Sequence, residues 1–309
     1  MFSQRSEQRH PFSSLVLLLV IALASFILFA FIAYFLGYFI FGPDELRGLS
    51  DGTAGIGIQK LFLGFSSIGM FVLPPFIFAR LESRTPFIYL QTNIPRPRVL
   101  LILGLIIMIF VTPFIEWTVL LNQRMKLPDF LEPIERWMQY KEISAEILTK
   151  KLLVMNSTGD LVLNLILIAV IPAVGEEFLF RGCIQKIFSR WTNNQHAGVW
   201  IAAIIFSTIH VQFFGFIPRM ILGALFGYML MLSQSIWVPV LAHFYNNASA
   251  VIVAYILQHQ GKSLDNLTKP AVQNWYLVIL SVIFTTLLFI IFKKISVNTN
   301  HKVNERGLE

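Results

Sequence analysis

Eight long apolar stretches run through this sequence and limit what it can fold into. They lie at about 13–41, 59–79, 98–121, 162–190, 197–214, 217–233, 236–257 and 274–292. Each approaches the roughly 20 apolar residues that a helix needs to cross a bilayer. In lipid the backbone must be paired within the protein, so only helices and closed barrels span a membrane, and unbroken apolar runs exclude the barrel. The sequence therefore predicts an all-α polytopic membrane protein, a bundle of about eight transmembrane helices.

The charged residues indicate how these helices are oriented. Only 13% of the residues are charged, against about 25% in an ordinary soluble domain. An even number of spans puts both termini on one side, and the loops of that side are rich in Lys and Arg. The positive-inside rule predicts that both termini are cytoplasmic, in the plasma (inner) membrane. Because orientation explains the net charge of +7, the expected partner is the lipid bilayer, and no nucleic-acid binding is inferred.

Three charged residues, Glu176, Glu177 and Arg181, stand well inside the apolar stretch 162–190, ahead of Lys186 and Arg190 near its end. One such charge at mid-helix costs roughly 2.5–3.5 kcal/mol on insertion scales, so its presence indicates a function. Glu177 and Arg181 are four residues apart and share one helix face. A structural ion pair between them is the plain alternative, but it leaves Glu176 unexplained. Pro172, just upstream, is expected to loosen the helix and admit water.

Other apolar stretches carry histidines. His210 ends an FxxxH pattern that begins at Phe206, and His243 precedes Asn247 by one helical turn. Taken singly, each reads as a polar group that joins helices. Counted at ~1.5 Å per residue from the cytoplasmic helix ends, Glu176, His210 and Asn247 lie roughly 18–21 Å deep. Similar depths on three helices predict a polar intramembrane cavity, which we expect to open toward the cytoplasm.

These side chains are suited to hydrolysis of an amide bond. A glutamate and a histidine can activate water, directly or through a metal, and a histidine with an asparagine can bind an oxyanion. An arginine can keep a buried glutamate ionised. A carboxylate and two imidazoles, here Glu176, His210 and His243, can also hold a divalent metal such as zinc with one open position. The HExxH and GxSxG signatures of other proteases do not occur.

At these residues the sequence resembles the CPBP family of intramembrane proteases, which groups CAAX prenyl endopeptidases with bacteriocin-processing and immunity-associated relatives. The family motifs EExxxR, FxxxH and HxxxN read here as Glu176 to Arg181, Phe206 to His210 and His243 to Asn247. The resemblance covers roughly 165–255. It implies an intramembrane endopeptidase that acts on a membrane-embedded or lipidated peptide.

The same resemblance implies a role for each motif residue. Glu176 would activate the attacking water, helped by His210, and His243 and Asn247 would form the oxyanion hole. Glu177 and Arg181 would support the site, with Glu177 able to share in catalysis. A metal-dependent and a metal-free glutamate mechanism both fit, so no cofactor is assigned and Glu176, His210 and His243 remain metal-ligand candidates.

The expected organisation has three parts. Residues 1–160 hold the first membrane helices and an extracytoplasmic amphipathic segment at about 122–160, 161–260 form the catalytic core, and 261–309 hold the last span and a basic cytoplasmic tail. Ile143, Ile147 and Leu148 recur at helical spacing in the amphipathic segment, which we expect to cap the bundle or gate the substrate. Two other functions remain open for the same polar groups: a transporter or channel with an ion relay, and a peptide-binding immunity or scaffold protein.

Overall fold

The computed structural model describes residues 9–267 and 274–306. All long elements in this part are helices. Seven helical segments in this part are long and apolar enough to cross a membrane. They are Pro11–Phe41, Ile56–Glu82, Val99–Gln123, Thr158–Thr192, Phe213–Ser233, Trp237–His259 and Trp275–Asn298. The all-α polytopic membrane fold is confirmed.

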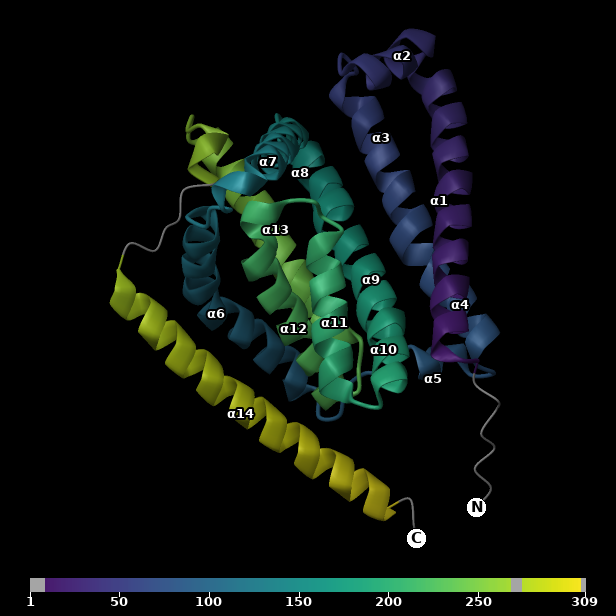
Figure 1. Cartoon of the computed structure of the whole chain (residues 1–309), viewed down its shortest axis with the longest axis vertical. Helices are drawn as coiled ribbons and strands as arrows, with labels where there is room; N and C mark the ends of the chain where they lie inside the picture. Colours follow the sequence, from purple (N-terminus) through teal and green to yellow (C-terminus); the bar gives the residue numbers. More distant parts are fainter. Residues whose placement is uncertain (1–8, 268–273, 307–309) are drawn as a thin grey trace.

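The chain begins and ends its helices at the same end of the bundle. Helix α1 (Pro11–Phe41) starts there and α14 (Trp275–Arg306) finishes there, whereas α2 (Pro43–Asp51) lies at the opposite end (Figure 1). Helices α3 (Ile56–Ser67) and α4 (Leu73–Glu82) return beside α1. The shared end agrees with the even number of crossings expected from the sequence. The terminal residues 1–8 and 307–309 lie outside the described part.

The expected span at 197–214 is wrong in length. Helix α11 (Gln195–Thr208) has only 14 residues, too few to count among the seven candidate spans. The chain leaves the helix after Ile209, and Val211 takes a φ of +53°, which a β-branched residue rarely adopts inside regular structure. A short turn at Phe213–Gly215 then leads into α12 (Phe216–Ser233). Helix α11 still carries the chain most of the way along the bundle (Figure 1).

The span that contains the two glutamates is irregular. It joins α8 (Thr158–Asn164), α9 (Ile171–Glu176) and α10 (Gln185–Thr192) through two wider, π-helical stretches, at Leu165–Val170 and Glu177–Ile184. Proline has no N–H and crowds the carbonyl four residues before it, which disturbs an α-helix at that point. Pro172 accounts for the first π-helical stretch, and such stretches are frequent at functional sites.

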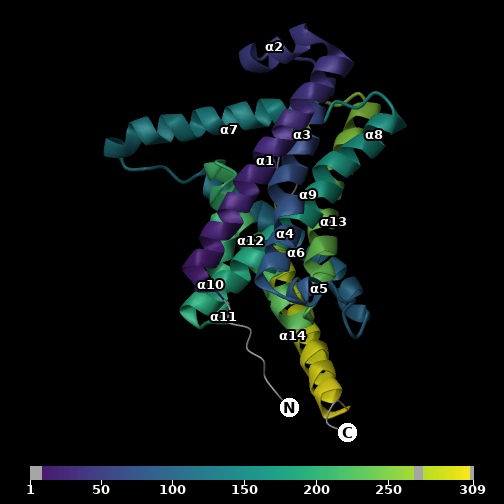
Figure 2. The same ribbon diagram turned by 90° about the vertical axis from the view of Figure 1, so that its right-hand side faces the viewer.

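Helix α7 (Glu132–Leu152) lies across one end of the bundle, crosswise to the spans (Figure 2). Its apolar residues Ile143 and Ile147 are 57% and 62% exposed, as expected for an amphipathic helix that rests on a membrane surface. Lys151 Nζ donates to the Ala54 carbonyl at 3.1 Å and anchors its far end. The predicted amphipathic helix within 122–160 is therefore present.

The remaining helices form the core that holds the site. They are α6 (Val99–Gln123), α12, α13 (Trp237–His259) and α14. Two glycines of α12 let it approach α11 closely: a Cβ on Gly223 would lie 3.2 Å from Ala203, and one on Gly227 would lie 2.9 Å from Val199. This close packing brings the end of α11 against the glutamate-bearing span.

Candidate active site

A buried ion pair forms the back wall of the site. The Arg181 side chain is 1% exposed and that of Glu177 is 0% exposed, and Arg181 Nη1 donates to Glu177 Oε1 at 2.9 Å. Arg181 Nη2 donates to the carbonyl of Gly223 at 3.0 Å, and the guanidinium carbon lies 4.6 Å from the ring centre of Phe206. A buried charge is tolerated only when it is paired and hydrogen-bonded, so Arg181 and Glu177 depend on each other.

His243 joins this pair to Glu176. Its Nδ1 lies 2.8 Å from Oε1 of Glu177, and its Nε2 lies 3.8 Å from Oε2 of Glu176. Because the Glu177 carboxylate can only accept beside Arg181, Nδ1 carries the proton, and Nε2 of the neutral ring holds a lone pair. The ring of Phe226 stacks on the imidazole at a centroid distance of 5.3 Å and fixes its plane. His243 thus presents one nitrogen to a supporting carboxylate and the other toward Glu176.

His210 is held by its own helix. Its Nδ1 donates to the Phe206 carbonyl at 2.7 Å, which explains the FxxxH spacing, since that carbonyl lies one turn back at the helix end. The carbonyl fixes the tautomer, so Nε2 of the neutral ring carries no proton. Phe206 also packs edge-on against His210 at 5.0 Å. His210 therefore offers Nε2 as a hydrogen-bond acceptor.

Asn247 contacts the irregular span. Its Nδ2 donates to the carbonyl of Ile168 at 3.2 Å, and this carbonyl is the one that loses its α-helical donor at Pro172. Its Oδ1 accepts from Nδ2 of Asn246 at 3.2 Å. An amide nitrogen carries two hydrogens, so Asn247 keeps one for another acceptor.

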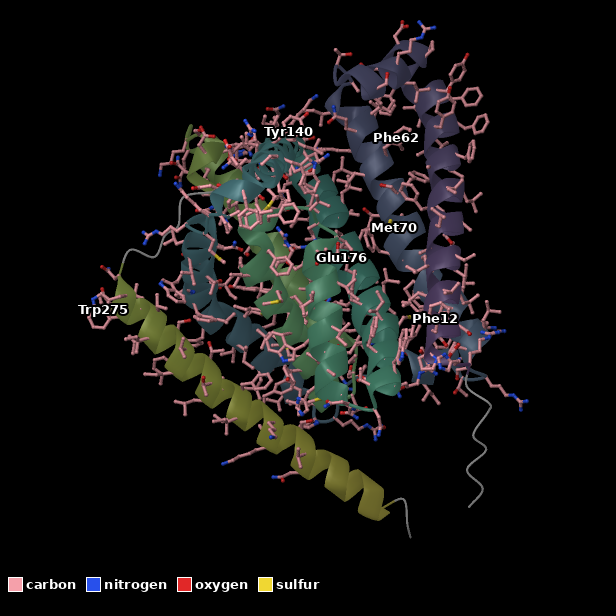
Figure 3. The ribbon with its side chains drawn as sticks, in the orientation of Figure 1. Phe12, Phe62, Met70, Tyr140, Glu176 and Trp275 are labelled. Atoms are coloured by element: carbon pink, nitrogen blue, oxygen red, sulfur yellow. The ribbon has the colours of Figure 1, made fainter. Side chains whose placement is uncertain are left out.

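The polar cavity, as we call it, has a volume of about 580 Å³. Glu176, His210, His243 and Asn247 line it, whereas Glu177 and Arg181 stand behind its wall. Figure 3 shows Glu176 among the central helices, between Tyr140 at the α7 end and Phe12 at the end where α1 starts. The sequence-predicted residues are therefore brought together around one cavity.

The expected opening of this cavity toward the cytoplasm stays a prediction, and the cavity reaches the end of the bundle that α7 covers. Thr149 and Leu152 of α7 line it, together with Gly215 and Arg219 near the start of α12. These residues belong to the end of the bundle that α7 covers (Figure 2). Depths counted along separate helices predicted a shared level for the polar groups but not the contribution of α7 to the cavity wall.

Three side chains at or beside the cavity were not predicted from the sequence. Phe226 stacks on His243, Arg219 lines the cavity, and Glu142 of α7 accepts from the Phe214 N–H at 3.4 Å. Burial raises the pKa of the Glu142 carboxyl, and the Phe214 hydrogen bond and the charge of Arg219 oppose this shift. Arg219 could have been identified as a candidate from the sequence, because it is a lone charge inside an apolar stretch.

The candidate metal ligands do not form a metal centre in this arrangement. Within the part of the chain that the structure describes, no three His, Cys, Asp or Glu residues are grouped so that they could hold a metal ion. Glu176, His210 and His243 line one cavity but do not meet that condition.

The fold and the cavity define a helical membrane protein with a buried polar site. Residues 158–249 match the family model described as type II CAAX prenyl endopeptidase Rce1-like. This segment contains all six motif residues, and the family expected from the motifs is confirmed for it. No curated protein and no solved structure matches the chain.

Proposed function

We propose that the protein is an intramembrane endopeptidase that hydrolyses a peptide bond of a membrane-associated or lipidated peptide. The observation that carries this proposal is the space of 3.8 Å between Glu176 Oε2 and His243 Nε2, at the wall of the cavity that His210 also lines. That distance is too long for a direct hydrogen bond, so Glu176 can contact a water and His243 can contact a substrate atom in the same space. The family match of residues 158–249 supports a protease.

In the proposed reaction, Glu176 takes a proton from this water as its oxygen attacks the scissile carbonyl carbon. His210 Nε2 accepts a hydrogen bond from the water and orients it. The carbonyl oxygen becomes an oxyanion, to which Asn247 donates its second amide hydrogen. When the carbon–nitrogen bond breaks, Glu176 returns the proton to the leaving amine.

His243 takes a more specific role than the sequence suggested. It can donate to an oxyanion only with a proton on Nε2, because the proton on Nδ1 is already donated to Glu177. The donating form is therefore the doubly protonated ring. Glu177, backed by Arg181, is placed to stabilise that form, as a carboxylate orients a histidine in other hydrolases.

Unbiased profiling of peptide termini tests this function. Membranes of cells that express the wild-type chain are compared with membranes that contain Glu176→Gln at the same level. New termini in membrane proteins or peptides should occur only with the wild type. Identical sets of termini in both samples would contradict the proposal, and a cation flux lost in Glu176→Gln would instead indicate a transporter.

A further inference from the structure

Arg219 is a second arginine in the site, and its surroundings differ from those of Arg181. Arg181 is paired with Glu177 and fully enclosed. The half-buried guanidinium of Arg219 donates only to neutral oxygens of Gln212, to the carbonyl at 3.3 Å and to Oε1 at 3.0 Å. Among the described residues it forms no ion pair with a carboxylate. A partly buried cation that no carboxylate contacts directly can accept an anionic partner that arrives with the ligand.

The chain makes room for this guanidinium. A Cβ on Gly215 would lie 2.8 Å from Arg219 Nη2, so a larger residue at position 215 would displace it. Gln212 fixes two of the guanidinium hydrogens, and a guanidinium has five. The remaining hydrogens are available to bind a carboxylate, for which the planar fork of arginine is well suited.

Arg219 also stands where a peptide would have to lie. It lines the polar cavity with Glu176, and its partner Gln212 lines a second hollow of about 1020 Å³ beneath α7. Thr149 lines both spaces. Glu142 and Glu176 are the two acidic groups whose charges act on Arg219. A substrate carboxylate near Glu176 would be repelled unless a cation met it there.

We propose that Arg219 is a specificity-determining residue that binds a carboxylate of the substrate on the α7 side of the scissile bond. This inference rests on the proposed function. The carboxylate comes either from the free C-terminus of the peptide or from an Asp or Glu side chain. Glu142 competes for the same guanidinium and so weakens this binding.

Affinity selection of a peptide library tests the proposal without requiring catalysis. The Glu176→Gln protein in detergent is incubated with N-acylated random hexapeptides, half ending in a free carboxylate and half in a carboxamide, and the retained peptides are quantified by mass spectrometry. Carboxylate-bearing peptides should be enriched at least about tenfold, the size expected for one charge-assisted hydrogen-bonded pair. Enrichment of free C-termini or of internal Asp and Glu distinguishes the two sources.

Three further variants in the Glu176→Gln background sharpen the result. Arg219→Gln should abolish the enrichment, and Glu142→Gln should increase it. Arg136→Gln is the matched control, because Arg136 lies on α7 with its side chain 69% exposed and should leave the enrichment unchanged. No retention, no carboxylate preference, or a preference that survives Arg219→Gln would overturn the proposal.

The wild-type protein separates this inference from the proposed function. With Glu176 intact, Arg219→Gln should raise KM for the carboxylate peptides and leave kcat nearly unchanged. An equal fall of kcat for carboxylate and carboxamide peptides would make Arg219 an oxyanion donor and refute the specificity role. Peptides that bind through Arg219 but are never cleaved would refute the protease and leave the recognition standing.

Discussion

His243 Nδ1 lies 2.8 Å from the same oxygen of Glu177, Oε1, that accepts the hydrogen bond from Arg181. One carboxylate oxygen thus fixes both a buried cation and the tautomer of a cavity-lining imidazole. This arrangement gives the two neighbouring glutamates of the sequence different positions in the site. Glu177 lies behind the cavity wall and supports the site, whereas Glu176 lines the cavity where a substrate would lie.

The first prediction concerns Glu177. Glu177→Ala should lower the free energy of unfolding by roughly 3–5 kcal/mol, because it leaves the Arg181 charge buried without a partner. The melting temperature of the purified protein in detergent measures this loss. Adding Arg181→Leu to Glu177→Ala should restore part of the stability but no activity. A Glu177→Ala protein that melts like the wild type would show that the pair is not a structural requirement.

The second prediction concerns the contrast with Glu176. Glu176→Gln should abolish cleavage while the melting temperature stays the same or rises, because a buried charge without a close ion pair is removed. His210→Ala should also abolish cleavage. The double variant should be little worse than either single one, since groups that act as a unit are non-additive. Additive losses in rate would argue that these residues do not serve one step.

The third prediction concerns Asn247. Asn247→Ala should lower kcat by ~10²–10³ if its second amide hydrogen binds the oxyanion. Its bond to the Ile168 carbonyl should add a stability loss of only about 0.6 kcal/mol. Asn246→Ala is the neighbouring control and should affect the rate far less. Near-normal kcat with a lowered melting temperature would make Asn247 a packing residue.

The fourth prediction concerns metal. The described residues offer no group of three ligands, so treatment with 1,10-phenanthroline should leave the cleavage rate unchanged. Elemental analysis of the purified protein measures bound zinc in parallel. Inhibition that is reversed by added zinc, but not by magnesium, would show that Glu176, His210 and His243 rearrange into a metal centre.

The fifth prediction concerns topology. We expect α7 on the outer face and the end of α14 in the cytoplasm, as the positive-inside rule indicates. The single native cysteine, Cys183, is buried, so added cysteines can be labelled separately. Gln139→Cys should react with an impermeant thiol reagent in intact cells, and Lys294→Cys only after permeabilisation. The reverse pattern would place α7 and the adjacent end of the cavity on the cytoplasmic side.

Much of the site follows from spacing along single helices. Glu177 and Arg181 share a face, as do His243 and Asn247, because their separation is one helical turn. Where α11 ends could not be predicted, since the apolar run continues past His210 while the imidazole caps the Phe206 carbonyl. Such a side-chain cap is a local interaction that the hydropathy of the sequence does not reveal.

The direction of the cavity depends on contacts between distant segments. Helix α7 is held at that end by Lys151 against Ala54 and by Trp137, whose ring lies 5.4 Å from that of Phe213. Neither contact has a periodic signal in the sequence. The position of α7, and with it the importance of Arg219 and Glu142, therefore required the structure.

The most direct test of the account is cleavage by the purified protein in proteoliposomes. Membrane peptides that gain new termini in cells are reconstituted with either the wild type or Glu176→Gln, in water enriched in ¹⁸O. The account predicts that the wild type alone releases products whose new carboxyl groups carry ¹⁸O, because Glu176 activates water for the attack. Products formed at the same rate by Glu176→Gln would contradict it.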